Sequence, residues 1–542
     1  MAVSLSDQVT TRRLVAACNN LIGYEDVAGS LLAVTGSSGD IDTTDQLQLF
    51  SGFQKAFVVN GANLKVVDFV NTRLTSEIQI VANIPLHGDI LTQDSTNAQM
   101  NVDYIYYNTT TLDHYVYGYT FSGTFDDAHD IKDADANVII TAANLSAVDE
   151  ATTMPHWYDW TPYNNNTTTY GSMPKKAYLG CLYRGRPVLG GNPAYPYQWY
   201  MARQNNPWDW AYTKNDAQSP VAGGNNDAGE IGDILRALIS YKDDYLIFGC
   251  ASSMWYLSGD ATYGGILNEL SLTTGIYGAR SFCWDDEGNL WWWGKNGIYK
   301  SNIPSQPVNV SAIDLPRLVK DEAVNPSTHR ITMEFDRDRQ GIKISIVVLA
   351  TGANSDYWYD LRTEGFSPES ASNEHGAYSL LYYDSNTPGL SGLLVGCRNG
   401  YVYNLDDSAP DDIGGADNAI SINSYVSLGP IIMGQSGKQG KIIGLNAVTA
   451  GGATGGTQSD SDDINFKVFT DLAAETIIER MAANINPNFA GVIKSPGRQR
   501  GGTKRQKAKG AFGGVRLENS NTGETWGFEK LDISVIPAGR IR

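Results

Sequence analysis

The sequence predicts an all-β protein, and three observations lead to this prediction. Tyr, Trp and Gly are abundant, with 30, 12 and 56 of the 542 residues, whereas charged residues make up only 18%. Apolar runs recur in pairs that are joined by tight polar turns. Helical spacing is confined to three short segments, 6–21, 316–323 and 472–483, and the last could equally be strand and loop. Aromatic residues and turn residues in these proportions favour strands over helices.

Six paired runs form the predicted hairpins. Asn-Gly stands between apolar runs at 60–61, 296–297 and 399–400, and Arg-Gly at 184–185. Asn-Gly is a strong hairpin signal because both turn positions need positive φ. The predicted hairpins are 54–69, 177–191, 243–260, 288–302, 333–348 and 391–407.

The runs at 245–248, 290–293 and 346–350 are continuously apolar. A sheet with one wet face would alternate, so both faces of these strands are expected to be covered. From the third hairpin onward the turns recur at a spacing of roughly 40 to 60 residues, the length of a four-stranded propeller blade. We therefore expect a β-propeller of about six blades, in the range of about five to eight, with a β-sandwich or jelly roll as the alternative.

The length suits several domains, and we expect four parts. Residues 1–83 form an N-terminal segment and the first blade, and 145–440 form further blades. Residues 84–144 form an inserted small β-barrel or sandwich that folds by itself, because Tyr alternates at 104, 106, 115, 117 and 119. Residues 441–542 supply the C-terminal strands that close the propeller, with a basic loop at 494–509.

The net charge of −19 argues against tight wrapping of nucleic acid, although a duplex could still slide past an acidic wall. The segment 494–509 is an exception, with seven basic residues and no acidic one. It could meet DNA phosphates or an acidic partner, or be only a solvated loop. The candidate contact residues are Arg498, Arg500, Lys504, Arg505, Lys507 and Lys509.

Motifs of enzymes and metal sites are missing from the sequence. The six histidines have no H-x-x-x-H spacing, and there is no P-loop or G-x-S-x-G. The run from Asp133 opens like a calcium loop, but Val138 and Asn144 stand where Gly and Glu are needed. The acidic run 460–463 is interpreted as a solvated loop. We expect no enzyme activity, no catalytic residue, no cofactor and no metal.

The five cysteines, Cys18, Cys181, Cys250, Cys283 and Cys397, have no C-x-x-C spacing and are expected to be buried. No window has the length and apolar character of a membrane span, and the first residues do not have the pattern of a signal peptide. Carboxylates stand beside aromatic residues at 157–160 and 208–210, where a sugar cleft could form. Tryptophans in a large β-protein are more often core or interface anchors.

The segment 185–212, continued by 229–260, resembles the tail nozzle, or packaged-DNA stabilisation, proteins of podoviruses, the short-tailed bacteriophages. The similar features are a segment rich in Asn, Pro and Trp, an I-x-x-x-L run, a D-x-L-x-F strand and a W-x-L-x-G-D strand. The residues that carry them are Asn192, Pro193, Trp199, Trp210, Ile234, Leu238, Asp244, Leu246, Phe248, Trp255, Leu257, Gly259 and Asp260. Residues 53–69 and 515–540 are similar to the first and last propeller strands of that family, and 122–131 to a small β-domain of phage tail proteins.

The resemblance, spread over about half of the chain, implies a structural protein of the virion tail that is made in the cytoplasm of the bacterial host. It implies a homohexameric ring that extends the channel of the portal and adaptor, retains packaged DNA and conducts it during ejection. The partners would be the adaptor ring, a tail fibre, spike or needle, and double-stranded DNA bound without sequence specificity. We expect a neutral or acidic channel, with the basic loop turned away from it. The alternatives are a propeller that binds a host glycan and, third, a phage-borne glycosidase.

Overall fold

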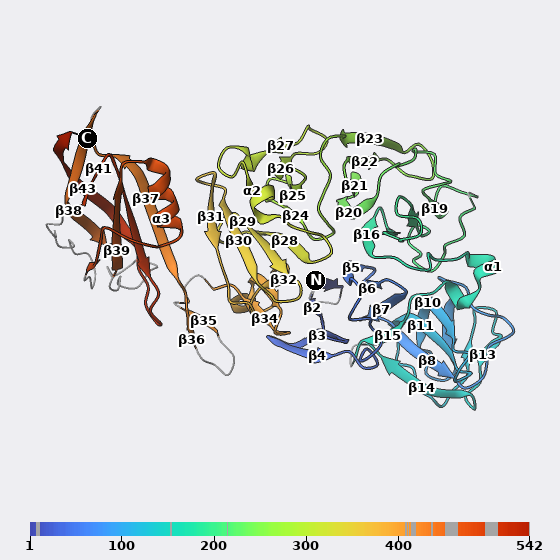
Figure 1. Cartoon of the computed structure of the whole chain (residues 1–542). Helices are drawn as coiled ribbons and strands as arrows, with labels where there is room; N and C mark the ends of the chain where they lie inside the picture. Colours follow the sequence, from blue (N-terminus) through green and yellow to red (C-terminus); the bar gives the residue numbers. More distant parts are fainter. Residues whose placement is uncertain are drawn as a thin grey trace. The chain divides into compact units, whose positions relative to one another are not determined.

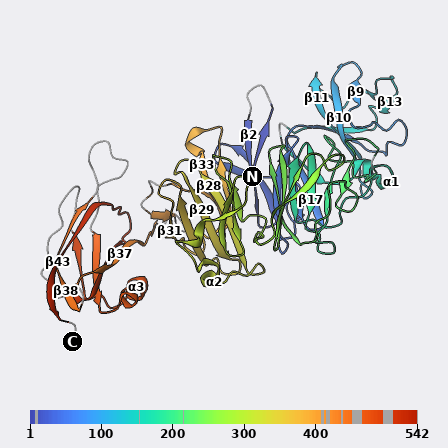
Figure 2. The ribbon, with the colours of Figure 1, turned by 90° about the horizontal axis from the view of Figure 1, so that it is seen from above.

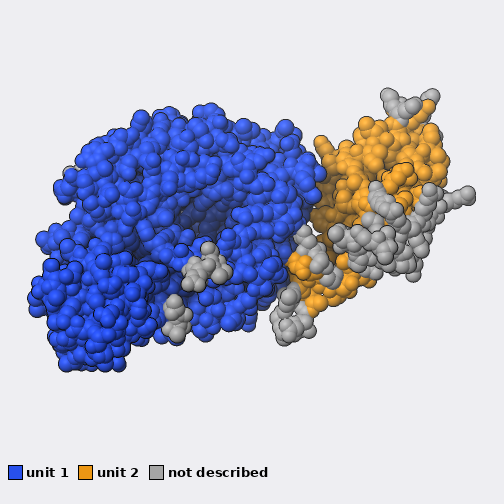
Figure 3. All heavy atoms as spheres, turned by 180° about the vertical axis from the view of Figure 1, so that it is seen from behind, with its two compact units in different colours: residues 1–405 blue, residues 406–542 orange. Residues whose placement is uncertain are grey.

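The computed structural model describes residues 1–6, 11–151, 154–213, 215–406, 409, 411–413, 419–434, 437–449, 464–493 and 508–540. The chain divides into two compact units, unit 1 (residues 1–405) and unit 2 (residues 406–542) (Figure 3). Strands account for 51% of the structure and helices for 5%. The prediction of an all-β protein is confirmed.

Unit 1 contains seven small antiparallel sheets that follow one another along the chain (Figure 1). Sheet 1 is β1 (Ala2–Leu5), β2 (Thr11–Cys18), β3 (Leu21–Val27) and β4 (Ser30–Ala33). Sheet 2 is β5 (Gln48–Gly52), β6 (Lys55–Asn60), β7 (Asn63–Asp68) and β15 (His156–Asp159). Sheet 3 is β16 (Leu179–Tyr183), β17 (Arg186–Gly190), β18 (Trp199–Met201) and β19 (Val221–Ala222). Sheet 4 is β20 (Leu235–Tyr241), β21 (Tyr245–Cys250), β22 (Met254–Ser258) and β23 (Ile266–Ser271).

The remaining three sheets complete the series. Sheet 5 is β24 (Phe282–Trp284), β25 (Leu290–Gly294), β26 (Gly297–Ser301) and β27 (Val308–Asn309). Sheet 6 is β28 (His329–Asp336), β29 (Gly341–Val348), β30 (Asn354–Asp360) and β31 (Gly365–Glu369). Sheet 7 is β32 (Ala377–Tyr383), β33 (Gly392–Cys397) and β34 (Val402–Asn404). The helical turns of unit 1 are η1 (Tyr163–Asn165), α1 (Thr167–Tyr170), η2 (Val310–Ala312), α2 (Leu318–Glu322) and η3 (Pro388–Leu390).

Most of these sheets bury apolar side chains against the next one in the chain. Shared cores join sheets 1 and 2, 2 and 3, 3 and 4, 4 and 5, and 5 and 6. Between sheets 6 and 7, the Thr332 hydroxyl donates to the Ala377 carbonyl at 3.4 Å. Sheet 7 meets sheet 1 through Leu14, Tyr383 and Leu394. The succession therefore closes on itself, as in a β-propeller.

The predicted hairpins are present. Of the three runs expected to be covered on both faces, 290–293 is buried throughout and 245–248 at every residue except Tyr245, whereas 346–350 is buried only at Ile346 and Val347. All five residues of β25, the strand with three consecutive tryptophans, are buried. The loop between β16 and β17 consists of Arg184 and Gly185, both at positive φ, which is the backbone of a tight hairpin turn. Seven sheets stand where about six blades were expected. The seventh arises because 11–18, predicted as part of a helix, forms β2 and pairs with β1 and β3.

A further sheet of seven strands lies between β7 and β15 in the sequence. This inserted sheet has the strand order β13-β12-β9-β10-β11-β8-β14, and Figure 2 shows its strands β9, β10, β11 and β13 from above. It spans 72–150, which is wider than the predicted 84–144. The reason is that β8 and β14, the first and last of its strands in the sequence, pair with each other. Its strands are β8 (Thr72–Ser76), β9 (Ile90–Gln93), β10 (Gln99–Tyr107), β11 (His114–Ser122), β12 (Ile131–Lys132), β13 (Val138–Ile140) and β14 (Leu145–Glu150).

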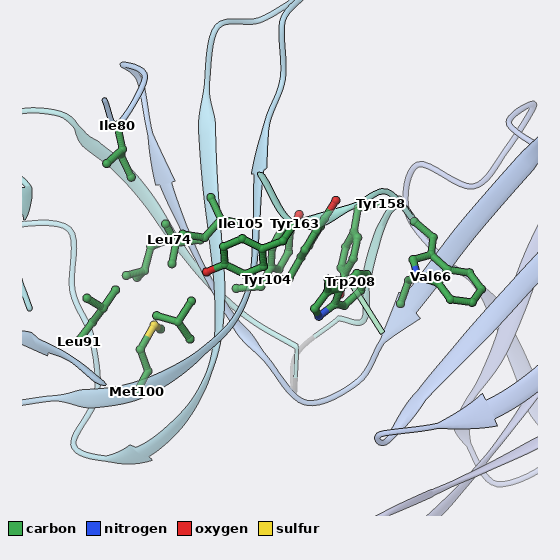
Figure 4. Close-up of a cluster of buried hydrophobic side chains, with 14 of the residues drawn as sticks. Val66, Leu74, Ile80, Leu91, Met100, Tyr104, Ile105, Tyr158, Tyr163 and Trp208 are labelled. Carbon is green, nitrogen blue, oxygen red and sulfur yellow. The ribbon is translucent and has the colours of Figure 1, made fainter. Parts of the chain in front are cut away.

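The inserted sheet shares its core with sheets 2 and 3, contrary to the expectation of a domain that folds by itself. Tyr104 of β10 stacks on Trp208 at 4.0 Å and on Tyr158 of β15 at 5.4 Å between ring centroids (Figure 4). Asp103, beside it, accepts from the Trp208 indole and pairs with Lys55 of β6 at 2.9 Å. Lys55 is buried and lies 3.7 Å from the second carboxylate of this group, Asp68. Aromatic rings and an ion network thus cross the boundary.

Unit 2 has two sheets with a core of their own. One has the order β37-β42-β39-β40 and the other β41-β38-β43, with a separate hairpin of β35 and β36. The strands are β35 (Asp411–Ile413), β36 (Ala419–Ser421), β37 (Ser424–Ile432), β38 (Lys438–Thr449), β39 (Ile464–Asp471), β40 (Phe489–Ile493), β41 (Ala508–Gly510), β42 (Phe512–Asn519) and β43 (Phe528–Arg540). The helix α3 (Ala474–Ala482), a predicted helix, buries Ile477 and Met481.

The expectation that 441–542 closes the propeller is wrong. The described strands of this region pair only with strands of unit 2, and their buried apolar side chains pack in clusters made of unit 2 residues. The physical reason is the long antiparallel pairing of β38 with β43 and of β39 with β42, which satisfies these backbones locally. The ring is closed instead by sheet 1, at the opposite end of the sequence.

Candidate functional site

Of the six predicted basic contact residues, the structure describes Lys509. Arg498, Arg500, Lys504, Arg505 and Lys507 lie outside the described residues. Lys509 is exposed in β41 and stands opposite Lys441 of β38. Like charges directly opposite each other in a strand pair repel, so Lys441 and Lys509 do not stabilise each other. Both side chains are available to solvent or to a partner.

The aromatic and acidic groups at 157–160 and 208–210 do not form a sugar cleft. Trp160, Trp208 and Trp210 are buried, and the indoles of Trp160 and Trp210 both donate to the Pro207 carbonyl at 2.9 Å. The Asp159 carboxylate pairs with Lys65 at 2.6 Å. These tryptophans are core anchors, as their number suggested.

The other candidates for chemistry have structural roles. Asp133 accepts hydrogen bonds from the Asp135 and Asn137 amides at 3.0 and 2.8 Å, which makes a closed turn. The acidic run 460–463 lies outside the described residues. Within the part of the chain that the structure describes, no group of three or more His, Cys, Asp or Glu side chains could hold a metal ion. Four cysteines are buried and Cys18 is half-buried.

A cavity of about 1340 Å³ lies in unit 1, and Figure 3 shows that unit is hollowed at the middle of its ring of sheets. It is lined by the first strands of successive sheets and by the turns that precede them, including 41–49, 235–236, 277–280, 329–331 and 378–381. Sequence analysis missed this site because its lining comes from short segments of many sheets, separated by some fifty positions along the chain.

The connection from β8 to β9 exposes a run of apolar side chains. Their exposed fractions are 37% or more, and Val81 reaches 76%. We name this run the apolar segment 78–90: Ile78, Val81, Ile84, Leu86 and Ile90. Several large apolar side chains exposed within one short segment are typical of a surface that contacts another molecule.

The residues that carry the resemblance to nozzle proteins build sheets 3 and 4. Trp199 of β18 packs on Phe248 of β21, with ring centroids 5.5 Å apart. The Gly259 carbonyl accepts from the Tyr183 hydroxyl at 2.9 Å, and Asp260 lies 3.4 Å from the buried Arg186. The resembling segments thus specify the packing of two adjacent sheets.

Comparisons with known proteins add little to this picture. No protein-family model matches the chain, and no curated protein matches it. A solved structure of a protein of unknown function from Bacteroides thetaiotaomicron is 10% identical with a TM-score of 0.23, covering 74% of this chain and 88% of its own. The extracellular domain of a protein described as a one-component system, from the same organism, is 9% identical with a TM-score of 0.15, covering 99% and 91%. Similarities this low support no argument.

Among the described residues, no helix is both long enough and apolar enough to cross a bilayer.

Proposed function

We propose that this chain is a structural protein of the tail of a short-tailed bacteriophage, where copies of it form the nozzle ring below the portal and adaptor. The observation that carries the proposal is the place of the resembling residues. The nozzle-like segments at 185–212 and 229–260 build two adjacent sheets of a closed series of sheets, so the resemblance extends over a contiguous packed region.

The apolar segment 78–90 supports a role in an assembly. Exposed apolar side chains gain free energy when a neighbouring copy or partner covers them, at about 25 cal/mol for each Å² removed from water. Four of them in the connection, together with Ile90 at the start of β9, provide a surface that a neighbouring copy could bury. In this proposal the ring is a hexamer and the segment lies in its subunit interface or in a fibre contact.

DNA in such a ring would pass between the copies. The cavity inside one copy has about 1340 Å³, close to the range of about 300–1,000 Å³ that small-molecule sites occupy. A channel shared by several subunits has no such limit. The negative net charge of −19 suits a wall that lets a polyanion slide, because few counterions are released on contact.

The experiment is the mass and shape of the purified full chain, alone and with the portal and adaptor proteins encoded beside it. Native mass spectrometry and electron microscopy should find six copies in a ring with an open axis. Val81→Asp and Leu86→Asp should weaken ring formation, whereas the matched control Ile313→Asp, at a side chain that is 89% exposed elsewhere in unit 1, should not. A monomer that binds host glycans and ignores the adaptor would contradict the proposal and favour a receptor-binding protein.

A further inference from the structure

Four arginines line the cavity of unit 1, and three of them come from consecutive sheets; the fourth, Arg398, donates to the Ala350 carbonyl at 3.2 Å. Arg236 is the second residue of β20, Arg330 is the second residue of β28, and Arg280 lies two positions before β24. They therefore occupy corresponding places at the start of the first strand in sheets 4, 6 and 5. Arg236 lies in a β-bulge between Leu235 and Ala237, a feature that redirects a side chain from the regular pleat.

None of the three arginines has a carboxylate within ion-pair distance among the residues that the structure describes. Arg280 donates to the Leu47 carbonyl at 3.3 Å and Arg330 to the Tyr378 carbonyl at 3.4 Å. A guanidinium has five N–H groups in a planar fork, so most of this donor capacity is unused. All three arginine side chains are half-buried, so their remaining N–H groups are open to the cavity that they line.

The two acidic side chains that line the same cavity have other partners. Asp42 accepts from the Thr44 amide at 2.9 Å and from its hydroxyl at 2.7 Å. Asp45 accepts from the Tyr178 hydroxyl at 3.0 Å. Both acids are thus held within their own turn and its neighbour, on the lining contributed by sheets 2 and 3. Arg236, Arg280 and Arg330 belong to sheets 4, 5 and 6, and Arg280 reaches the turn before β5 through its hydrogen bond to the Leu47 carbonyl.

The charge of Arg330 acts on Arg280. Burial and then the charge of Arg330 lower the pKa of Arg280 to about 10. Burial and then the charge of Arg280 lower the pKa of the Met1 amine to about 5, although the Glu334 carboxylate acts in the opposite direction. Like charges gathered without a counterion are unfavourable, and an anion between them would remove that cost.

We propose that this cavity binds a small multivalent oxyanion, held by Arg236, Arg280 and Arg330. The planar donor fork of arginine matches the geometry of phosphate and carboxylate oxygens and pairs with them in bidentate fashion. The cavity is large enough for a diphosphate or a tricarboxylate and small for a macromolecule. This inference does not depend on the proposed role in a phage tail.

The experiment is isothermal titration of the full chain at constant ionic strength with inorganic phosphate, pyrophosphate and citrate. For the wild type we expect saturable binding of pyrophosphate or citrate at one site per chain, and weaker binding of inorganic phosphate. Arg280→Gln and Arg330→Gln should bind pyrophosphate or citrate at least about tenfold more weakly. Arg280→Lys keeps the charge without the fork and should bind with intermediate affinity. The matched control Arg362→Gln removes an exposed arginine that pairs with Asp360, and should bind as the wild type does.

Thermal unfolding distinguishes a variant that has lost the anion site from a variant that binds poorly because it is misfolded. Without the anion, Arg280→Gln should unfold no earlier than the wild type, since it removes a like charge from the cluster. With pyrophosphate, the wild type should gain more in Tm than Arg236→Gln and Arg280→Gln do. The proposal is overturned if neither pyrophosphate nor citrate binds to the wild type, or if the wild type and the arginine variants gain equally.

Discussion

The inserted sheet and unit 2 differ in where their cores lie. The inserted sheet enters and leaves through two strands that pair with each other, and could be mistaken for an independent module. Its buried side chains nevertheless belong to one cluster with sheets 2 and 3. Unit 2 follows unit 1 in the chain and has a cluster made only of its own residues. Independence is therefore decided by which side chains share a core, and not by how the chain connects two parts.

The polar groups follow the same division. In the inserted sheet, Asp103 pairs with Lys55 of sheet 2, and Asn71 bridges Asp103 and Asp68 at 2.7 Å each. In unit 2, Glu518 pairs with Lys467 and Arg516, which lie in adjacent strands of the same sheet. Removing the inserted sheet would take away the closer carboxylate partner of the buried Lys55 in sheet 2. Both ion pairs of Glu518 lie within unit 2, so separating the units leaves them intact.

The largest expected effect is that of deleting the inserted sheet. A variant that replaces 77–144 by a Gly-Gly turn keeps β8 and β14 paired but removes Tyr104 and Asp103. Trp208 and Tyr158 then lose their stacking partner, and Lys55 loses its closer carboxylate. We expect unit 1 to aggregate or to lose its cooperative unfolding transition, measured by near-UV circular dichroism and calorimetry. A soluble variant with the unit 1 transition of the full chain would show that the two cores are separable.

A single substitution tests the shared aromatic core. Tyr104→Ala should lower the free energy of unfolding of unit 1 by about 3–5 kcal/mol, because a large buried ring leaves a cavity in a close-packed region. The control is Tyr119→Ala in the neighbouring strand β11, where the side chain is 46% exposed and the change should stay within about 0.5 kcal/mol. Denaturant unfolding followed by tryptophan fluorescence measures both, and equal effects would argue against the shared core.

The ion network that crosses the boundary predicts a dependence on pH. Burial alone would raise the pKa of Asp103, but the charges of Lys55 and His87 and the hydrogen bond from Trp208 lower it to about 2. A carboxyl with a folded pKa below its unfolded value stabilises the protein above the unfolded value, near pH 4, and this contribution is lost as the pH falls toward 2. Asp103→Asn should cost about 3 kcal/mol at pH 7 and reduce the loss of stability between about pH 4 and 2. An unchanged acid profile in the variant would place the titrating groups elsewhere.

The smallest effect on unit 1 should come from the largest truncation. Removal of 406–542 should leave the Tm of unit 1 within a few degrees of its value in the full chain, because the described strands of unit 2 pair only with one another. The separate fragment 406–542 should give its own unfolding transition. A loss of more than about 10 °C in unit 1 would reveal a stabilising interface between the units.

Local signals predicted much of the fold. The apolar runs around tight turns identified six hairpins, and the alternating tyrosines identified the inserted strands. The segment 11–18 was predicted as part of a helix, and its Leu, Ala and Arg residues favour helices. It forms a strand because its pairing with β1 and β3 supplies backbone hydrogen bonds that local preferences do not include. The C-terminal boundary was missed because pairing such as that of β38 with β43 joins strands ninety residues apart.

The sequence by itself determined the strand content, the hairpin turns and the two-sided burial of strands such as β25, because these depend on neighbours a few residues away. Only the tertiary structure decided that the inserted sheet shares a core with sheets 2 and 3, that unit 2 stands on its own core, and that Arg236, Arg280 and Arg330 line one cavity. The physical reason is that these arrangements join residues about forty or more positions apart along the chain. Their free energy comes from contacts that exist only once the sheets have packed.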